Sequence, residues 1–335
     1  MRVLGWMLGI ILVVTACSSG SNQLNGAGTG TTAGGHQLRL GMALGGPKND
    51  KGFSQACYQG LVNAGEQFSM KIQVRENVVD PQARIEALRD LAQSNDIVIG
   101  CSGAFAADGT QVAPQFPKVT FLMLNGETSD APNLYAYKLR EGVPAYIAGR
   151  VAAEVTKTNK IGFLGAEEIP PTIEAGRGFE AGVKASGKPI QFSRTIVGSF
   201  NDVEKARLAA AAMIKDGVDY VYSHLDQGIV GVVKAFQEAG SQGRTFEIIA
   251  NRCSEFPNQL AGASVGDVTA LVVKMVGDYI NKQTPPNRLL LVGVQLPNVQ
   301  RLELCPGFAT PKLQKLVDDV TKGINDGTIK LPSGF

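Results

Sequence analysis

The stretch that decides the fold is "LRLGMALGGPKNDKGFSQACYQGL", which runs from Leu38 to Leu61. Its first seven residues, 38–44, form a short apolar run that is typical of a buried strand. A glycine-rich turn follows, and apolar residues after Asp50 then recur at helical spacing. A strand that leads through a turn into a helix is the repeating unit of a parallel α/β sheet, and the helix N-terminus is a common ligand site.

The same unit repeats along the chain, with short apolar runs alternating with amphipathic helical stretches. The strands that this pattern predicts are 38–44, 71–74, 96–100 and 119–124, followed by 160–165, 191–197, 218–222 and 246–250. A helix predicted at 141–156 separates the two sets of four. This order favours an α/β protein with two doubly wound, Rossmann-like lobes, and a single eight-stranded sheet is the alternative.

A helix predicted at 267–281 and a strand at 289–294 come after both sets, so we expect a hinge with several crossovers. The expected lobe boundaries follow from this order. The N-terminal lobe is expected to contain 37–138 plus about 252–288, and the C-terminal lobe 139–251 plus about 289–335.

The N-terminus reads "MRVLGWMLGIILVVTACSSGSN", with one arginine, an apolar run and then small residues. These features predict a signal peptide over 1–16. The segment before Cys17 is similar to the lipobox of bacterial lipoproteins, in which this cysteine carries the lipid. Residues 17–36 would then form a flexible tether, because they are too polar to build a core. We therefore expect an extracytoplasmic protein that is lipid-anchored to the membrane; an ordinary cleavage site near a cysteine is the alternative.

The composition excludes several classes of function. The formal net charge is +2, and no basic block suggests a nucleic-acid partner. There are only two histidines, His36 and His224, so neither a metal cluster nor a histidine-based triad is easily assembled. The segment "GVKASGKP" (182–189) imitates a phosphate-binding loop, but Pro189 replaces the required hydroxyl residue. We expect no catalytic residues, no metal and no cofactor, and hence no enzyme.

Four cysteines remain beyond Cys17, and export would permit them to pair. Four cysteines allow three connectivities. We favour a disulfide between Cys253 and Cys305, because both follow strand-like runs late in the chain. Free buried thiols are the alternative.

Two phenylalanines stand where strands lead into helices. Phe53 follows Asp50, a natural helix cap, although its place in an apolar helical stripe also fits core packing. Phe200 lies in "VGSFND" (197–202), where its staple partner would be Lys205, a poor one. One aromatic residue at a strand exit in each lobe suits a clamp on a flat ring.

The segment "DKGFSQACYQGL" resembles the D-K-S-F-N-Q motif of the basic membrane protein family, the lipoprotein receptors of ABC importers for purine nucleosides. Further similar segments follow in the same order at 137–166, 169–185, 197–202, 228–240 and 324–332. The resemblance implies a type I periplasmic-binding-protein fold and a small-molecule ligand. Its implied partners are an ABC permease and its ATPase, and we expect the receptor itself to be a monomer.

The family also implies roles for individual residues. Phe53 and Phe200 match the two phenylalanines that sandwich the purine, and Asp50 matches the acid that faces the ligand. Ser54 stands where the family motif has asparagine, and Asn125 replaces the acid that closes the fourth strand.

The sugar-binding positions depart further from the family. Asn251 or Arg252 lies near the place of the acid that binds the ribose hydroxyls, and Gly266 replaces a lysine. Each lost charged hydrogen bond costs about 1.5–3 kcal/mol. We therefore expect a purine nucleoside first, with a free nucleobase or another planar heterocycle as the alternative. A non-transport, ligand-sensing surface lipoprotein is the second class of function; a nucleoside hydrolase would need an acid or metal constellation that the sequence does not show.

Overall fold

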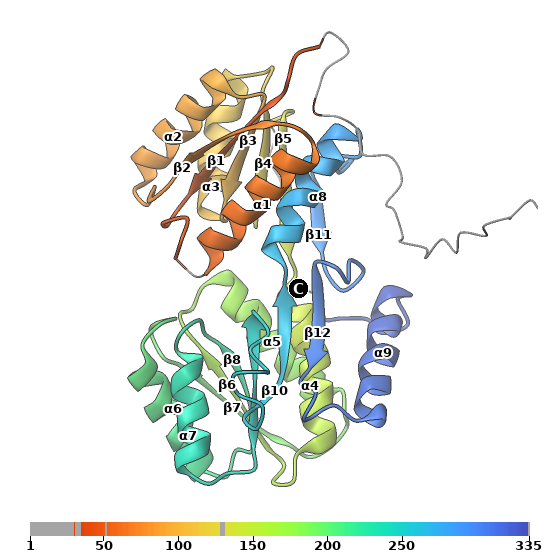
Figure 1. Cartoon of the computed structure of the whole chain (residues 1–335). Helices are drawn as coiled ribbons and strands as arrows, with labels where there is room; N and C mark the ends of the chain where they lie inside the picture. Colours follow the sequence, from red (N-terminus) through yellow and green to blue (C-terminus); the bar gives the residue numbers. More distant parts are fainter. Residues whose placement is uncertain (1–29, 31–34, 51, 128–130, 334–335) are drawn as a thin grey trace, which may run out of the picture.

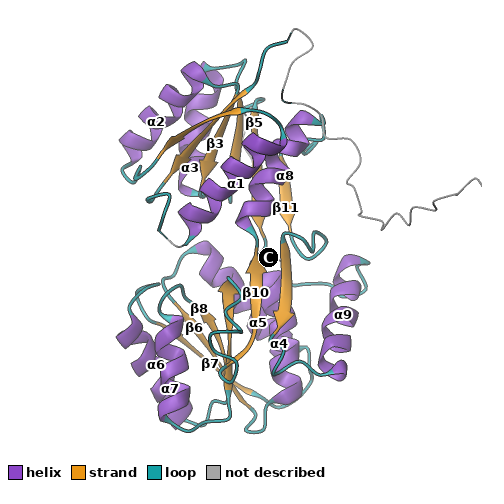
Figure 2. Ribbon diagram, viewed as in Figure 1, coloured by secondary structure: helices purple, strands orange, loops and turns teal. Residues whose placement is uncertain are grey.

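The computed structural model describes residue 30 and residues 35–50, 52–127 and 131–333. These residues form two α/β lobes, each built around its own six-stranded sheet (Figures 1 and 2). The prediction of two lobes is therefore confirmed, and the single eight-stranded sheet is excluded. The predicted signal peptide, Cys17 and nearly all of the predicted tether lie outside the described residues.

The sheet of the N-terminal lobe has the strand order β11-β5-β4-β3-β1-β2, and every pairing in it is parallel. Its strands are β1 (Arg39–Leu44), β2 (Lys71–Arg75), β3 (Ile97–Cys101), β4 (Thr120–Leu124), β5 (Leu134–Leu139) and β11 (Leu289–Val292). Its helices are α1 (Phe53–Gln67), α2 (Pro81–Ser94), α3 (Ala104–Val112) and α8 (Val268–Ile280), with a 3-10 turn at Ala113–Gln115. One apolar core joins α1 and α8 to the sheet, and another joins α2 and α3 to it.

The sheet of the C-terminal lobe has the order β12-β10-β9-β8-β6-β7, in which only β12 is antiparallel to its neighbour. Its strands are β6 (Lys160–Gly165), β7 (Gln191–Ile196), β8 (Tyr220–His224), β9 (Arg244–Ile249), β10 (Leu260–Gly266) and β12 (Gln300–Leu304). Its helices are α4 (Gly142–Val155), α5 (Pro170–Lys184), α6 (Val203–Lys215), α7 (Ile229–Glu238) and α9 (Pro311–Asn325). Helices α4, α5 and α9 share one apolar core, and α6 and α7 share the other.

The chain passes between the lobes three times: from β5 to α4, from β10 to α8 and from β11 to β12. The expected boundaries at about 252 and 289 need correction. Strand β10 extends the C-terminal sheet beside β9, and β11 extends the N-terminal sheet beside β5. The sequence of β10, LAGASVG, was not recognised as a strand because its small residues have little intrinsic strand preference. The second crossing therefore follows Gly266.

Two disulfides reinforce the lobes. Cys253 pairs with Cys305 and joins the segments that follow β9 and β12. Cys57 pairs with Cys101 and joins α1 to the end of β3, with their Cα atoms 6.4 Å apart. Within the described residues, no helix has both the length and the apolar character needed to span a bilayer.

Candidate functional site

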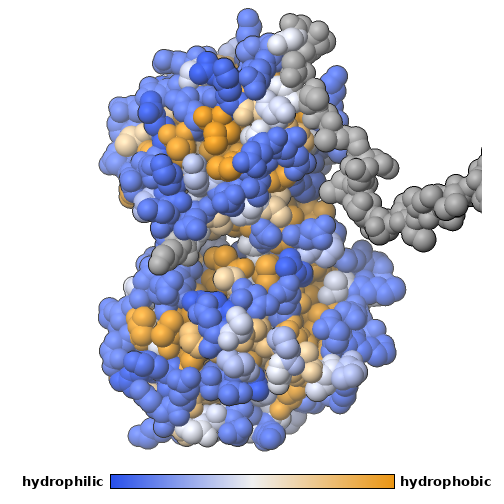
Figure 3. Space-filling view, viewed as in Figure 1, coloured by the Kyte–Doolittle hydropathy of each residue, from blue (hydrophilic) through white to orange (hydrophobic). Residues whose placement is uncertain are grey.

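A cavity of about 690 Å³ lies between the lobes, beyond the carboxyl ends of the parallel strands. Figure 3 shows the surface drawn inward between the two lobes. The N-terminal lobe lines the cavity with Asp50, Gly52, Phe53 and Ala56. Residues 265–269, where the chain passes from β10 to α8, also line it. The C-terminal lobe lines it with Asn201, Leu225, Asp226, Gln227, Ile248, Ile249, Ala250, Arg252 and Glu255.

The first turn of α1 forms the N-terminal wall. The Asp50 carboxylate accepts hydrogen bonds from the backbone N–H groups of Gly52 (2.8 Å), Ser54 (3.2 Å) and Gln55 (3.0 Å). Partial burial acts to raise the pKa of Asp50, but these hydrogen bonds outweigh it and hold the pKa below its usual value. Phe53, the first residue of α1, is half-buried; it packs on the apolar core and also lines the cavity.

The loops after β7 and β8 form the opposite wall, and they are hydrogen-bonded to each other. The Phe200 carbonyl accepts from the N–H groups of Asp226 and Gly228, both at 3.0 Å. The Phe200 ring is half-buried against the C-terminal core, and its centroid lies 6.1 Å from that of His224. Asn201, the next residue, lines the cavity, so the Phe200 ring lies beside the cavity rather than on its lining in this structure.

An ion pair with one buried partner supports the wall that follows β9. The Glu247 carboxylate is fully buried and accepts from the Arg252 backbone N–H (2.6 Å) and from Arg252 Nε (2.8 Å). Burial raises the pKa of Glu247, and its hydrogen bonds with Arg252 oppose that rise. Arg252 Nη2 also donates to the Asp226 carbonyl at 3.3 Å. The guanidinium is thus fixed at the cavity with its charge already balanced.

Asp226 is a site residue that the sequence reading missed. It is exposed to the cavity, yet the surrounding protein desolvates its carboxyl enough to raise its pKa. The Arg252 charge opposes this rise, and the Asp50 carboxylate of the other lobe adds to it. Two acids therefore face each other across the cavity. The available signal was an acid placed two residues after a buried strand, at the ligand-binding edge of a parallel sheet.

Besides Phe200, three predicted site residues lie outside the cavity lining. Ser54 is buried and hydrogen-bonds the Asp50 carboxylate. Asn125 Oδ1 accepts from the Leu139 N–H at 3.0 Å, and Asn251 Nδ2 donates to Glu303 at 2.5 Å. All three side chains serve contacts within their own lobe, so we leave them out of the proposed ligand contacts.

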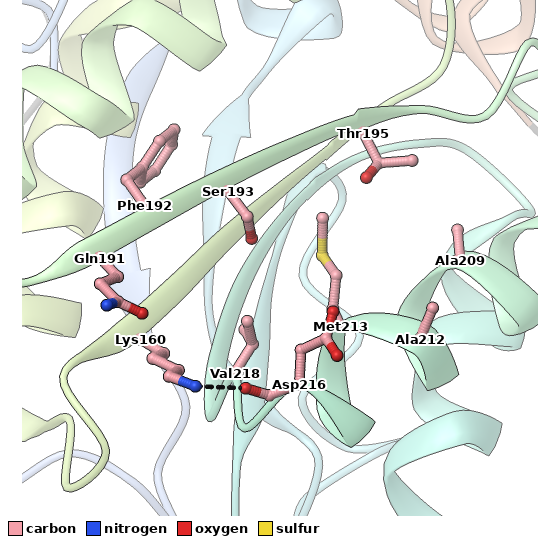
Figure 4. A pocket seen from close by; sticks show the side chains of 10 residues that line it. All are labelled: Lys160, Gln191, Phe192, Ser193, Thr195, Ala209, Ala212, Met213, Asp216 and Val218. Carbon is pink, nitrogen blue, oxygen red and sulfur yellow. Dashed lines mark hydrogen bonds between the residues drawn. The ribbon is translucent and has the colours of Figure 1, made fainter.

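A second cavity, of about 520 Å³, lies in the C-terminal lobe between β7 and α6 (Figure 4). Ser193 and Thr195 line it from β7, and Met213 lines it from α6. Its one lysine, Lys160, donates through Nζ to the Asp216 carbonyl at 2.7 Å. The lining residues that the structure describes come from one lobe and include Phe192 as their one aromatic side chain, so we place the candidate site between the lobes.

The site offers little for metal binding or acid–base catalysis. Across the described ranges, no three histidine, cysteine or acidic side chains are grouped so that they could hold a metal ion. His224 is buried, and its Nδ1 lies 3.2 Å from Thr172 Oγ1. Burial lowers the pKa of His224 to about 4, so the imidazole is neutral near pH 7.

His224 predicts a specific loss of stability in acid. The unfolded chain binds this proton near pH 6.5 and the folded chain near pH 4, so its contribution is complete above pH 6.5 and is lost as the pH falls toward 4. Between pH 7.5 and 4.5 we expect the unfolding free energy of the wild type to fall by about 2–3 kcal/mol more than that of His224→Gln. Urea titration at both pH values measures this. Equal losses in the two proteins would contradict the buried neutral histidine, and His36→Gln is the exposed control.

Two lobes with mainly parallel sheets, three crossovers and a cavity between the sheet edges define the fold class: this is a two-lobed protein with the type I periplasmic-binding fold. More particularly, the chain belongs to the family of PnrA-like ABC transporter substrate-binding proteins, whose model matches residues 37–327. Its ligand is accordingly a small molecule and its partner a transporter permease. Proteins of this class bind solutes outside the cytoplasm and are not enzymes.

Individual proteins agree with this assignment. The chain is 27% identical over 300 residues to basic membrane protein A2 of Borrelia garinii subsp. bavariensis, with 88% of each chain covered. It is 28% identical over 302 residues to the ABC transporter nucleoside-binding protein BmpA of Lactococcus lactis subsp. cremoris, covering 85% of this chain and 86% of that protein.

Solved structures share the fold. A solute-binding protein of an ABC transporter system from Conexibacter woesei has a TM-score of 0.70 at 20% identity, covering 89% of this chain and 99% of that one. A transcriptional activator from Bacillus halodurans has a TM-score of 0.74 at 22% identity, covering 88% of this chain and 99% of that one. The two-lobed fold thus serves more than one kind of protein, and the site must carry the functional argument.

Proposed function

We propose that this protein binds a purine nucleoside between Phe53 and Phe200 and delivers it to an ABC permease. The observation that carries the proposal is the interlobe cavity, which has Phe53 on one wall and the Phe200 loop on the other. Aromatic faces on both sides suit a flat, hydrophobic ring. The nucleoside-binding name of the Lactococcus relative supports the same ligand class.

Binding requires the lobes to move together. The Phe200 ring lies beside the open cavity, so closure must bring it against the ligand. Three crossing segments join the lobes, which is the arrangement that permits hinge closure. A ligand drives closure only if it binds the closed state more tightly than the open one. The permease would then distinguish the loaded receptor by its closed shape.

A free nucleobase or another planar heterocycle is the second candidate, and a specific observation favours it. Asn125 and Asn251 are engaged within their own lobes, and Gly266 lines the cavity without a side chain. The sugar of a nucleoside would therefore find fewer partners than the ring. A free base has no sugar hydroxyls, so the missing sugar partners would cost it little binding free energy.

We also propose that Cys17 carries a lipid that anchors the monomeric receptor to the membrane. The sequence before Cys17 supports this anchor, and the polar segment after it would hold the lobes away from the bilayer. Loss of the protein from the membrane fraction in a Cys17→Ser variant tests the anchor. Retention of that variant on the membrane would refute it.

Thermal unfolding against a ligand panel tests the proposed function. The chain from Ser18 onward keeps both lobes but lacks Trp6, its single tryptophan, so calorimetry is the suitable method. We expect adenosine, guanosine or inosine at about 100 times the dissociation constant to add about 2.7 kcal/mol of stability and raise the Tm. Ribose, glucose and amino acids are the controls. A shift with sugars or amino acids alone would exclude the proposed ligand class.

A further inference from the structure

We infer that the interlobe cleft selects its ligand by charge, and that Asp226 is the residue responsible: the site accepts neutral or cationic planar ligands that donate hydrogen bonds, and rejects anionic ones such as nucleotides. The inference rests on the proposed function for the position of the ring. It goes beyond that function by naming the charge of the ligand and the side chain that reads it.

The ionisable side chains that the structure describes around the cavity are predominantly acidic. In the described part of the lining, four carboxylates, from Asp50, Asp226, Glu255 and Asp267, stand against the one guanidinium of Arg252. Arg252 offers little net attraction to an anion, because the fully buried Glu247 already pairs with it. An anionic ligand would therefore enter a negatively charged cavity without an uncommitted cation among the described lining residues.

Asp226 differs from Asp50 and Asp267 in how its carboxylate is held. Asp50 accepts from the first turn of α1, and Asp267 Oδ1 accepts from the Ala270 N–H at 2.8 Å. In the part of the chain that the structure describes, no group donates a hydrogen bond to the Asp226 carboxylate. Its backbone is fixed on both sides, by the N–H that donates to Phe200 and the carbonyl that accepts from Arg252.

An acceptor that is fixed in a cleft but has no donor needs one when the cleft closes. Closure removes water from the Asp226 carboxylate, and the cost is recovered only if the ligand supplies a hydrogen-bond donor. Closure also brings Asp226 nearer to Asp50. The Asp50 charge already disfavours the ionised form of Asp226. Hydroxyl, amino or cationic groups relieve this repulsion, whereas a phosphate or carboxylate adds to it.

Two ligand series that each vary charge on one ring test the inference by isothermal titration calorimetry. The purine series is adenosine, 1-methyladenosine and adenosine 5′-monophosphate. The pyridine series is nicotinamide, 1-methylnicotinamide and nicotinate, in which the neutral and anionic members have nearly the same size. In each series that binds to the wild type, we expect the anionic ligand to have an affinity roughly 100-fold lower than that of its neutral parent.

The variants assign the effect to Asp226. We expect Asp226→Asn to reduce the preference for neutral over anionic ligand by roughly tenfold, and Asp226→Glu to retain most of it. Asp216→Asn is the matched control, because it removes one exposed carboxylate from the same lobe at the second cavity (Figure 4). Thermal unfolding of each variant checks that it is folded; Asp226→Glu keeps the test informative if Asp226→Asn is unstable.

The outcomes separate this inference from the proposed function. Binding of neutral or cationic pyridines without any purine would remove the purine assignment and support charge selection. Binding of adenosine 5′-monophosphate or nicotinate as tightly as its neutral parent would overturn charge selection, whichever ring is preferred. A preference that stays the same in Asp226→Asn would overturn the role of Asp226, and a complete lack of binding would overturn both proposals.

Discussion

Replacing Phe53 and Phe200 together with alanine is expected to weaken binding of the planar ligand by at least roughly 100-fold. Loss of one aromatic stack on a base costs about 1–3 kcal/mol, and the proposed clamp has one stack in each lobe. Each single variant should lose roughly 10-fold or more. The comparison is made by titration calorimetry with the tightest nucleoside or base from the panel.

The controls must separate the clamp from general packing, because both rings are half-buried against apolar cores. Phe116 and Phe308 are half-buried rings that also pack on those lobes, but neither lines the interlobe cavity. Their alanine variants should lose stability while they keep the affinity of the wild type. If the double variant of Phe53 and Phe200 folds and still binds within about threefold, the clamp is refuted.

The second large effect is expected from Arg252→Ala, which removes the only cationic partner that the structure shows for the fully buried Glu247. Breaking a buried ion pair by removing one partner costs about 3–5 kcal/mol, because the remaining charge is uncompensated. Urea titration at pH 7 should show a loss of unfolding free energy of this size. The loss should shrink at lower pH, where Glu247 binds a proton and its charge disappears.

A paired variant distinguishes this cause from lost packing. Arg252→Ala combined with Glu247→Gln removes the stranded charge and should recover a large part of the lost stability. A simple loss of packing would be unchanged by the second substitution. A loss below about 1 kcal/mol in Arg252→Ala would show that the pair lies in a more solvated setting than the structure indicates.

Much of the fold could be predicted, because its strands are short apolar runs separated by helices of clear periodicity. All eight strands of the two predicted sets of four appear at or near their expected positions. Strands β5, β10 and β12 were not predicted. Strand β12 has the sequence QRLEL, and its charged residues suit an edge strand that faces solvent but do not produce an apolar run. The crossovers depend on which sheet such strands join, so local patterns did not locate them.

The site could be predicted only where a residue carries its own local signal. Phe53 stands out as an aromatic residue in the first turn of a helix, and it lines the cavity. Asn251 and Arg252 were indistinguishable as neighbours in sequence; the structure turns Asn251 to Glu303, while Arg252 lines the cavity. Asp226 has only the weak signal of an acid just after a buried strand, and its setting depends on Asp50 of the other lobe. A short stretch of sequence does not indicate which residues of the other lobe its side chains will approach.

The most direct test of the central claim is a crystal structure of the chain from Ser18 onward with the tightest nucleoside or base from the panel. We predict closed lobes, with the heterocyclic ring between Phe53 and Phe200 and ligand donors directed at Asp226. A ligand bound in the cavity between β7 and α6, or between the lobes without contact to either phenylalanine, would contradict the account.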